Sequence, residues 1–218
     1  MPATETLIIV FARAPEPGRA KTRLLPLLGA DGAAALPALL IERTLATAVA
    51  ASVGRVELWC APSAQHPLLD AFMQRHGIEG ITQCEGDLGA RMQHAAMSAL
   101  ATNPRVLLIG TDCPALTPAD LRAAAGALAA HDAVLIPAED GGYVLLGLTQ
   151  WDARLFTNIA WGGDQVLAAT RERLAALDWR WQELPPLWDV DRPEDFVRLR
   201  NSGLMPELAG APALSRNV

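Results

Sequence analysis

Apolar runs alternate along this chain with alanine- and leucine-rich stretches in which apolar residues recur at helical spacing. The runs predict strands and the periodic stretches predict helices, and their alternation is typical of a mostly parallel sheet covered by helices. The predicted strands are residues 6–12, 55–61, 79–83, 105–110, 132–138, 143–149 and 179–184. The predicted helices are residues 31–52, 67–76, 87–102, 118–130, 163–176 and 193–201.

The predicted strands at 132–138 and 143–149 are joined differently from the others. Only the segment Glu139–Gly142 lies between them, which is too short for a crossover helix. We therefore expect an α/β fold whose mostly parallel sheet contains one reversed strand. We expect one domain over residues 1–202, followed by an irregular tail at 203–218 that mixes Gly, Pro, Ala and Ser.

Three predicted helices carry a signal at their first turn. Thr117 is a capping residue followed by proline at the first helical position and by Asp120 in the first turn. Asp31 and Asp87 are expected to cap two further helices in the same way.

The loop after the first predicted strand holds the only lysine of the chain, Lys21. The other cations in or beside this loop are Arg13, Arg19 and Arg23, and Pro15, Pro17 and Gly18 prevent regular structure. In open α/β sheets ligands bind at the carboxyl ends of the strands, where a glycine lets the backbone approach an anion and basic side chains supply charge. A phosphate-binding loop is the favoured interpretation, and a solvated basic turn is the alternative.

Asp112 follows the predicted strand at 105–110 in the segment Gly-Thr-Asp-Cys-Pro. The next helix has its own cap in Thr117, so Asp112 is free to bind a metal ion such as Mg²⁺, which takes one or two carboxylates with phosphate and water oxygens. The alternative is a turn-forming aspartate bonded to its own backbone.

A second carboxylate is expected from the segment Asp189-Val-Asp191, just before the helix that Pro193 opens. Residues two apart on an extended segment face the same side, so both side chains can point at one site. Asp191 is the candidate metal ligand and Asp189 supports it. The alternative role for Asp191 is to cap the helix.

Two glycine-bearing connections are further candidates. Asp140, Gly141 and Gly142 lie between the two antiparallel strands, where an Asp-Gly pair is also the signature of a hairpin without any function. Residues 83–92 form a strand-to-helix connection that either lines a base or sugar pocket or makes a tight turn.

Composition narrows the class of ligand. The net charge is −6, so the surface as a whole repels nucleic acid, and a basic loop on an acidic protein favours a small anionic ligand. The cysteines are three in number, without C-x-x-C spacing, which argues against a disulfide framework or a zinc site. No basic leader and no apolar run of about 18 residues is present, so a cytoplasmic protein without a membrane segment is expected. Other chemistries find no support in the sequence. The histidines lack a metal-binding spacing, and the chain contains neither a G-x-S-x-G elbow nor a complete Walker A motif.

Four motifs together resemble the nucleotide-diphospho-sugar transferase superfamily, and they occur here in that superfamily's order. They are P-x-P-G-x-x-K-T-R-L, G-T-D-C-P, E-D-G-G-Y and D-V-D-x-P-E-D. The chain is most similar to uncharacterised bacterial transferases labelled glycosyltransferases, including the arsenosugar-biosynthesis type, and more distantly to phospholactate and molybdenum cofactor guanylyltransferases. The resemblance covers about residues 5–200. It implies a three-layer α/β/α GT-A fold of Rossmann-like type.

The resemblance also implies roles for individual residues. It places nucleotide phosphates against Arg13, Gly18, Lys21 and Arg23, with Lys21, Arg13 and Asp112 as the catalytic residues. It places Mg²⁺ or Mn²⁺ on Asp112 and Asp191, the base near Gly86, Asp87, Leu88 and Gly89, and the acceptor or sugar against Asp140, Gly141 and Gly142. One departure matters: glycosyltransferases of this fold usually carry D-x-D at the central metal site, whereas this chain has Thr111-Asp112-Cys113. Arg192 stands where relatives often carry threonine, which leaves the local geometry at Asp191 open.

These features favour nucleotidyl transfer from a nucleoside triphosphate to a small anionic acceptor, for instance a phosphate or phosphonate, with release of pyrophosphate. Such a reaction needs positioning and charge neutralisation more than a protein nucleophile. The alternative is glycosyl transfer from a nucleotide-sugar, and the third hypothesis is a nucleotide-binding module without catalysis. The partners expected are small molecules, with neither nucleic acid nor membrane. The base, the acceptor and the oligomeric state, a homodimer among them, stay open.

Overall fold

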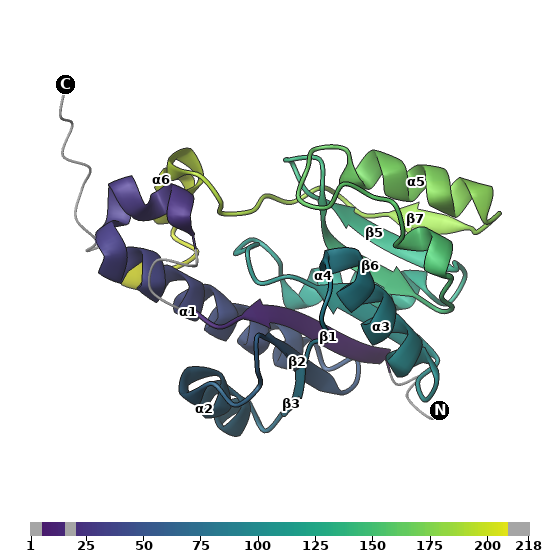
Figure 1. Cartoon of the computed structure of the whole chain (residues 1–218), viewed down its shortest axis with the longest axis horizontal. Coiled ribbons are helices and arrows are strands. Elements are labelled where there is room, and N and C mark those ends of the chain that lie inside the picture. Colours follow the sequence, from purple (N-terminus) through teal and green to yellow (C-terminus); the bar gives the residue numbers. More distant parts are fainter. Residues whose placement is uncertain (1–5, 16–20, 209–218) are drawn as a thin grey trace.

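The computed structural model describes residues 6–15 and 21–208 of the chain. Strands and helices alternate along it, as Figure 1 shows. The strands are β1 (Thr6–Arg13), β2 (Val56–Ala61), β3 (Glu79–Thr82), β4 (Arg105–Ile109), β5 (Ala133–Pro137), β6 (Tyr143–Leu148) and β7 (Trp181–Glu183). The helices are α1 (Leu25–Ala51), α2 (Pro67–His76), α3 (Leu88–Leu100), α4 (Pro118–Ala127), α5 (Val166–Ala176) and α6 (Pro193–Ser202).

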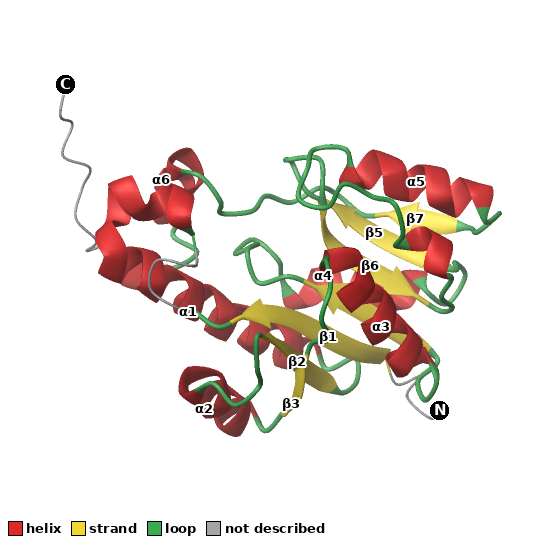
Figure 2. Cartoon of the chain, viewed as in Figure 1, coloured by secondary structure: helices red, strands yellow, loops and turns green. Residues whose placement is uncertain are grey.

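The strands form one seven-stranded sheet in the order β3-β2-β1-β4-β6-β5-β7. β6 runs antiparallel to both of its neighbours, β4 and β5, and every other pairing is parallel. The predicted reversed strand is therefore confirmed, and the fold is the single-domain, three-layer α/β/α arrangement expected from the sequence (Figure 2).

Helices cover both faces of the sheet because alternate side chains of each central strand point to opposite sides. In β1, Ile8 and Val10 pack into a cluster with α1, α2 and α4, whereas Leu7 and Ile9 pack into a second cluster with α3 and α5. Both clusters are almost fully buried. The sheet is thus a rigid platform whose carboxyl edge carries the loops that matter for function.

A third buried cluster joins residues 24–40 to residues 188–208. Leu24, just before α1, and Leu36 and Leu40 of α1 pack against Phe196 and Leu199 of α6. The turn Pro206–Leu208 closes this cluster with the buried side chain of Leu208, so residues 203–208 of the predicted tail pack against the rest of the chain. Residues 209–218 lie outside the described part.

The predicted elements agree with the structure to within a few residues, with one exception. α1 begins at Leu25, but Gly29, with φ of 66°, is non-helical and separates a short first turn from the long helix that follows. The predicted start near residue 31 therefore agrees with the start of this long segment, and the turn before Gly29 is an addition to the prediction. The side chain of Asp31 lies outside the described part, so its expected capping role stays a prediction. The caps expected elsewhere are confirmed: Thr117 and Asp120 form a capping box, and Asp87 Oδ1 accepts the N–H of Ala90 at 2.8 Å.

Within residues 6–15 and 21–208, no helix combines the length and the apolar character needed to cross a membrane.

Candidate nucleotide and metal site

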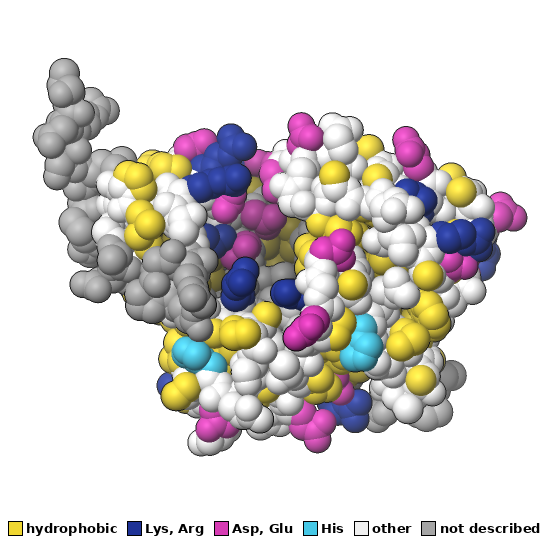
Figure 3. Space-filling view, in the orientation of Figure 1, with side chains coloured by type: hydrophobic (Ala, Val, Ile, Leu, Met, Phe, Trp, Pro, Cys, Tyr) yellow, Lys and Arg dark blue, Asp and Glu magenta, His cyan; other side chains and the backbone are white. Residues whose placement is uncertain are grey.

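The site lies where the strand order reverses. β1 pairs with β2 on one side and with β4 on the other, and in open α/β sheets ligands bind in the crevice that this reversal leaves at the carboxyl edge. The basic loop follows β1 and the segment with Asp112 follows β4, so the topology brings the two motifs to one place. Figure 3 shows basic and acidic side chains gathered around a hollow on this face of the molecule.

Lys21 occupies the centre of this region. Its backbone is left-handed, with φ of 49°, and its side chain is only 8% exposed. The ammonium Nζ lies 2.9 Å from Asp112 Oδ1 and donates to the carbonyl oxygen of Val190 at 2.5 Å. A single buried cation therefore links three segments that are far apart in the sequence.

The segment Asp189–Asp191 is held directly against the loop after β4. The N–H of Val190 donates to the carbonyl oxygen of Asp112 at 2.8 Å, and the carboxylate of Asp191 is paired with the guanidinium of Arg23. Both candidate metal ligands are about half exposed. The structure thus brings together Lys21, Arg23, Asp112 and Asp191, which the sequence expected at one site, in two cation–carboxylate pairs that the sequence did not predict.

Asp189 lies deeper than the other carboxylates and is more strongly perturbed. Burial, and then the neighbouring carboxylates of Asp112 and Asp140, raise its pKa to about 7, against an opposing effect of Lys21. Three carboxylates therefore lie close enough to influence one another electrostatically. Their mutual repulsion is the kind of strain that a bound cation relieves.

The carboxylates around Lys21 suit a hard divalent cation. Carboxylate oxygens, free of nitrogen and sulfur ligands, are what Mg²⁺ and Mn²⁺ prefer, and Asp112 and Asp191 each present an oxygen at the edge of the same cavity. In the part of the chain that the structure describes, no three His, Cys, Asp or Glu side chains form a complete metal site by themselves. A metal held here would complete its shell with water and substrate oxygens, as Mg²⁺ commonly does.

The cavity beside Asp112 has a volume of about 360 Å³ and is bordered by Arg13, Lys21, Asp112 and Asp191. Arg13 is exposed at the end of β1. Gly18 and Arg19, which the sequence also assigned to this loop, lie outside the described residues. Leu88, at the first position of α3, borders the same cavity from the opposite side.

The connection Glu139–Gly142 turns β5 into β6, and it also faces the site. Asp140 Oδ1 accepts the N–H of Gly142 at 2.9 Å, which is the hairpin role. Asp140 also borders two cavities, and Gly142 borders one of them. Gly141 has φ of 93°, and a Cβ there would meet the carbonyl oxygen of Asp164 at 2.1 Å. The turn is therefore pressed against the segment before α5.

The connection Gly86–Gly89 serves mainly to start α3. Asp87 caps the helix, and Gly86 O accepts from Arg91 Nε at 3.0 Å. A Cβ on Gly89 would meet the indole nitrogen of Trp161 at 2.3 Å, so glycine permits close packing there. Of these four residues Leu88 is the one that borders the cavities, and its side chain is 44% exposed.

The alternative role considered for Asp191 is filled by another residue. The carboxylate of Asp195 accepts the backbone N–H groups of Asp191 and Arg192 at 3.1 and 2.7 Å, so Asp195 caps α6. The side chain of Asp191 is left to pair with Arg23. The local geometry at Asp191, which Arg192 left open, is thus set by the carboxylate of Asp195.

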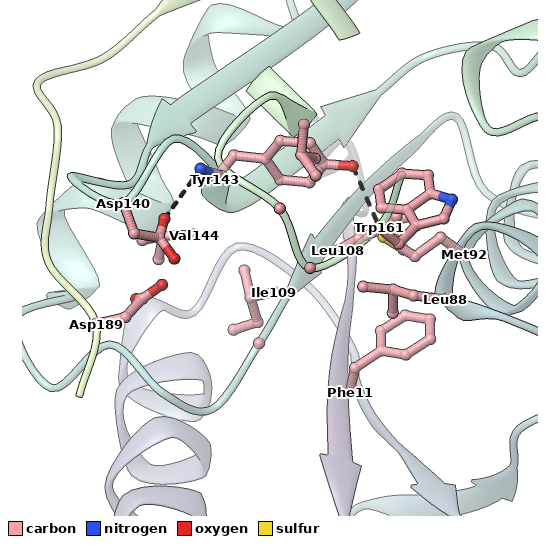
Figure 4. Close-up of a pocket in the computed structure, with 15 residues that line it drawn as sticks. Phe11, Leu88, Met92, Leu108, Ile109, Asp140, Tyr143, Val144, Trp161 and Asp189 are labelled. Atoms are coloured by element: carbon pink, nitrogen blue, oxygen red, sulfur yellow. Dashed lines mark hydrogen bonds between the residues drawn. The ribbon is translucent and has the colours of Figure 1, made fainter. Parts of the chain in front are cut away.

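Sequence reasoning understated two features of the site. Asp189 was treated as a support, yet it is the most buried carboxylate of the group and borders two cavities. Phe11, Tyr143 and Trp161 form an apolar wall of a cavity that Asp189 also borders, as Figure 4 shows. The only sequence signal was their position at the ends of strands or next to glycines.

Comparison with known proteins agrees with this architecture. The model of a family described as "Uncharacterized protein conserved in bacteria (DUF2064)" matches residues 44–163. A crystal structure from Desulfovibrio desulfuricans G20, provisionally described as a nucleotide-diphospho-sugar transferase, superposes with a TM-score of 0.84 at 29% identity, over 95% of this chain and 91% of that one. A comparison with curated proteins finds no significant match.

More distant structures share the fold. Rv0371c of Mycobacterium tuberculosis H37Rv in complex with manganese has a TM-score of 0.59 at 20% identity, over 91% of this chain and all of that one. A nucleotidyl transferase of Methanothermobacter, Mth528, has a TM-score of 0.62 at 15% identity, over 93% and 99% of the two chains. The fold is therefore that of the nucleotide-diphospho-sugar transferase superfamily.

Proposed function

The chain belongs to the DUF2064 family, and we propose that it is a metal-dependent transferase that moves a nucleotidyl group from a nucleoside triphosphate to a small-molecule acceptor. One observation carries the proposal. The cation of the β1–α1 loop, Lys21, meets the carboxylate after β4, Asp112, at the carboxyl edge of the sheet, next to the segment of Asp189 and Asp191. Cations for phosphates and oxygens for a divalent ion thus lie side by side.

The basic side chains would bind and orient the triphosphate. Arg13 and Lys21 border one cavity together, so a polyphosphate there can contact both. Two unit charges 4 Å apart interact by about 4 kcal/mol at an effective dielectric constant near 20. Arg23, paired with Asp191 at the rim, can approach the same phosphates by a rotamer change.

A divalent ion would be held by Asp112 and Asp191, and when bound it supplies positive charge that neutralises phosphate oxygens. The Mn²⁺ complex of Rv0371c is consistent with such a requirement. Lys21 would keep the Asp112 carboxylate oriented toward the cavity through its contact with Oδ1.

The reaction then needs positioning rather than a protein nucleophile. An oxygen of the acceptor attacks the α-phosphorus, the bond from that phosphorus to the bridging oxygen breaks, and pyrophosphate leaves with the electron pair. If the acceptor oxygen carries a proton, the proton passes to water or to a carboxylate of the site.

Glycosyl transfer from a nucleotide-sugar is the second candidate, favoured by the description of the Desulfovibrio structure. The single Asp112, without the D-x-D of most glycosyltransferases of this fold, favours the first candidate. The two differ in their products: pyrophosphate from a nucleoside triphosphate, or a nucleoside diphosphate from a sugar donor. Metal-dependent nucleotide binding without either product would indicate a binding module.

The experiment that tests the site is the substitution Lys21→Ala, compared with Arg122→Ala. Arg122 lies on α4 and donates to the carbonyl oxygen of Ala50, at the end of α1 remote from the site. Thermal shifts are measured with the four nucleoside triphosphates and a set of nucleotide-sugars, with Mg²⁺, Mn²⁺ or EDTA. The unmodified protein at a ligand concentration of 100 times the dissociation constant gains about 2.7 kcal/mol of stability.

We expect Lys21→Ala to weaken nucleotide affinity at least tenfold and Arg122→Ala to leave it unchanged. Lys21→Met, which keeps most of the buried side-chain volume, separates loss of charge from loss of folding. Equal nucleotide affinity in all the proteins would overturn the assignment of the loop. A panel in which no nucleotide shifts the unmodified protein would overturn the proposed function itself.

A further inference from the structure

A second cavity opens beside the proposed phosphate site, and its walls are mostly apolar. Its volume is about 210 Å³, and it lies between the ends of β1, β4 and β6 and the segment before α5. Phe11, Met92, Tyr143, Val144, Trp161 and Val166 line it. Figure 4 shows the aromatic side chains at one end of the cavity and the carboxylates of Asp140 and Asp189 at the other.

The charge of this lining is of one sign. Asp140 and Asp189 are its acidic side chains, and none of the described residues that border it is basic. Lys21 does not border this cavity, and its ammonium is already engaged by the carboxylate of Asp112 and the carbonyl oxygen of Val190. An anion placed in this cavity would therefore face carboxylates without a basic side chain to pair with.

The apolar walls point to a compact nonpolar body in the ligand. Small-molecule sites are typically apolar clefts with a few polar groups that fix orientation. Leu88 at the mouth is 44% exposed although it is a large apolar residue, and a ligand in the cavity would cover part of it. The hydroxyl of Tyr143 is turned to the sulfur of Met92, at 3.8 Å, and is therefore not aimed at an anion.

We infer that this cavity is the acceptor subsite, and that it selects a molecule with a compact apolar body, a hydroxyl group at the carboxylate end and no negative charge. The inference rests on the proposed function, because it is the adjacent phosphate site that makes a ligand here an acceptor. An acceptor without negative charge replaces the small anionic acceptor that the sequence features favoured. The basic loop binds the nucleotide, and the charged side chains that face the acceptor are carboxylates.

Three probes of nearly equal size test the inference: 2-phenylethanol, phenylacetate and 2-phenylethylamine, which at pH 8 are neutral, anionic and cationic. Dissociation constants are measured by ligand-observed NMR with the full chain in EDTA, so that neither metal nor nucleotide takes part. We expect 2-phenylethanol to bind at least tenfold more tightly than phenylacetate, a difference of 1.4 kcal/mol. We expect 2-phenylethylamine to bind at least as tightly as the alcohol, and ethylamine, which lacks the apolar body, to bind at least tenfold more weakly than 2-phenylethylamine.

Asp140→Asn removes one charge and keeps the turn, because the amide oxygen can still accept the N–H of Gly142. In this variant the preference for the alcohol over phenylacetate should fall at least threefold. Asp178→Asn is the matched control: Asp178 has φ of 56°, a conformation that asparagine tolerates, and it lies between α5 and β7. The control should keep the preference of the unmodified protein.

The inference is overturned if phenylacetate binds as tightly as the alcohol, if the amine binds more weakly than phenylacetate, or if no probe binds. It is also overturned if Asp140→Asn and Asp178→Asn behave alike. If no nucleotide binds but the probes bind in the predicted order, the cavity remains a small-molecule site and loses its role as acceptor site. If nucleotides bind but the order of the probes is reversed, the proposed function stands and this subsite is rejected.

Discussion

Asp189 and Asp191 border one cavity but have different partners. The spacing of two residues on an extended segment predicts that both face the same side, and both do border the same cavity. Asp191 is tied to Arg23, whereas Asp189 is buried near Asp112 and Asp140. The sequence could identify Asp112, Asp191 and Lys21 because each belongs to a motif. It could not reveal the perturbed state of Asp189, because that depends on the approach of three separate segments.

The raised pKa of Asp189 predicts how stability changes with pH. Its pKa is about 7 in the folded chain and near 3.8 in the unfolded chain, so between these values the folded state holds a proton that the unfolded state has released. Stability contributed by this group is therefore present below about pH 4 and is lost as pH rises toward 7, by at most about 4 kcal/mol. In EDTA, urea unfolding should show that Asp189→Asn is more stable than the unmodified chain at pH 8, by more than at pH 4.5.

The control for this titration is Asp178→Asn, which removes a carboxyl group outside the site. Its difference from the unmodified protein should be the same at both pH values. If Asp189→Asn also gives a difference that does not change with pH, the carboxyl group of Asp189 titrates normally and the burial argument fails.

At the scale of elements, strands and most helices could be predicted because apolar residues recur along the sequence with the spacing of each kind of element. The seven predicted strands all occur. The five central strands are apolar runs, whereas β3 and β7, at the edges of the sheet, are short and carry polar residues. The short turn of α1 before Gly29 could not be predicted in the same way. Gly29 interrupts the helical geometry, yet Pro26 fits the first turn and Leu24 is fully buried beside α6, which holds the first turn in place. A distant contact thus determined a local boundary.

Replacing glycine by alanine should change the free energy of unfolding in opposite directions at two positions, Gly141 in the β5–β6 turn and Gly126 in α4. Gly141→Ala forces a side chain into positive φ and into the carbonyl oxygen of Asp164, so it should lower the free energy of unfolding by about 1–3 kcal/mol. Gly126→Ala lies in α4 with nothing within 4 Å of the new methyl group, and it should raise that energy by about 0.5–1 kcal/mol. Chemical denaturation of both variants measures the two signs. A neutral Gly141→Ala would mean that the turn is not pressed against the segment before α5.

At the scale of the whole molecule, the two halves of the proposed site are held by the third buried cluster. Lys21 and Arg23 lie just before Leu24, and Asp189 and Asp191 lie on either side of Val190, and both Leu24 and Val190 are fully buried in this cluster. Arg198 of α6 also stacks over Trp188 at 4.4 Å and donates to Glu139 at 2.6 and 3.1 Å, which lowers the pKa of that carboxyl. Packing between residues 24–40 and 188–208 therefore sets the distance between cations and carboxylates.

This arrangement predicts that damage to the third cluster weakens nucleotide binding beyond its effect on stability. Phe196→Leu and Phe72→Leu each remove part of a buried ring and should each cost about 1–2 kcal/mol of folding stability. Phe196 packs in the cluster that carries the site, whereas Phe72 of α2 packs on the face shared with α4. At a temperature where both variants are fully folded, calorimetric titration with the best-binding triphosphate should give a severalfold weaker affinity for Phe196→Leu and an unchanged affinity for Phe72→Leu. Equal affinities would mean that the basic loop and the Asp189–Asp191 segment keep their geometry without this cluster, and that the site is a local structure.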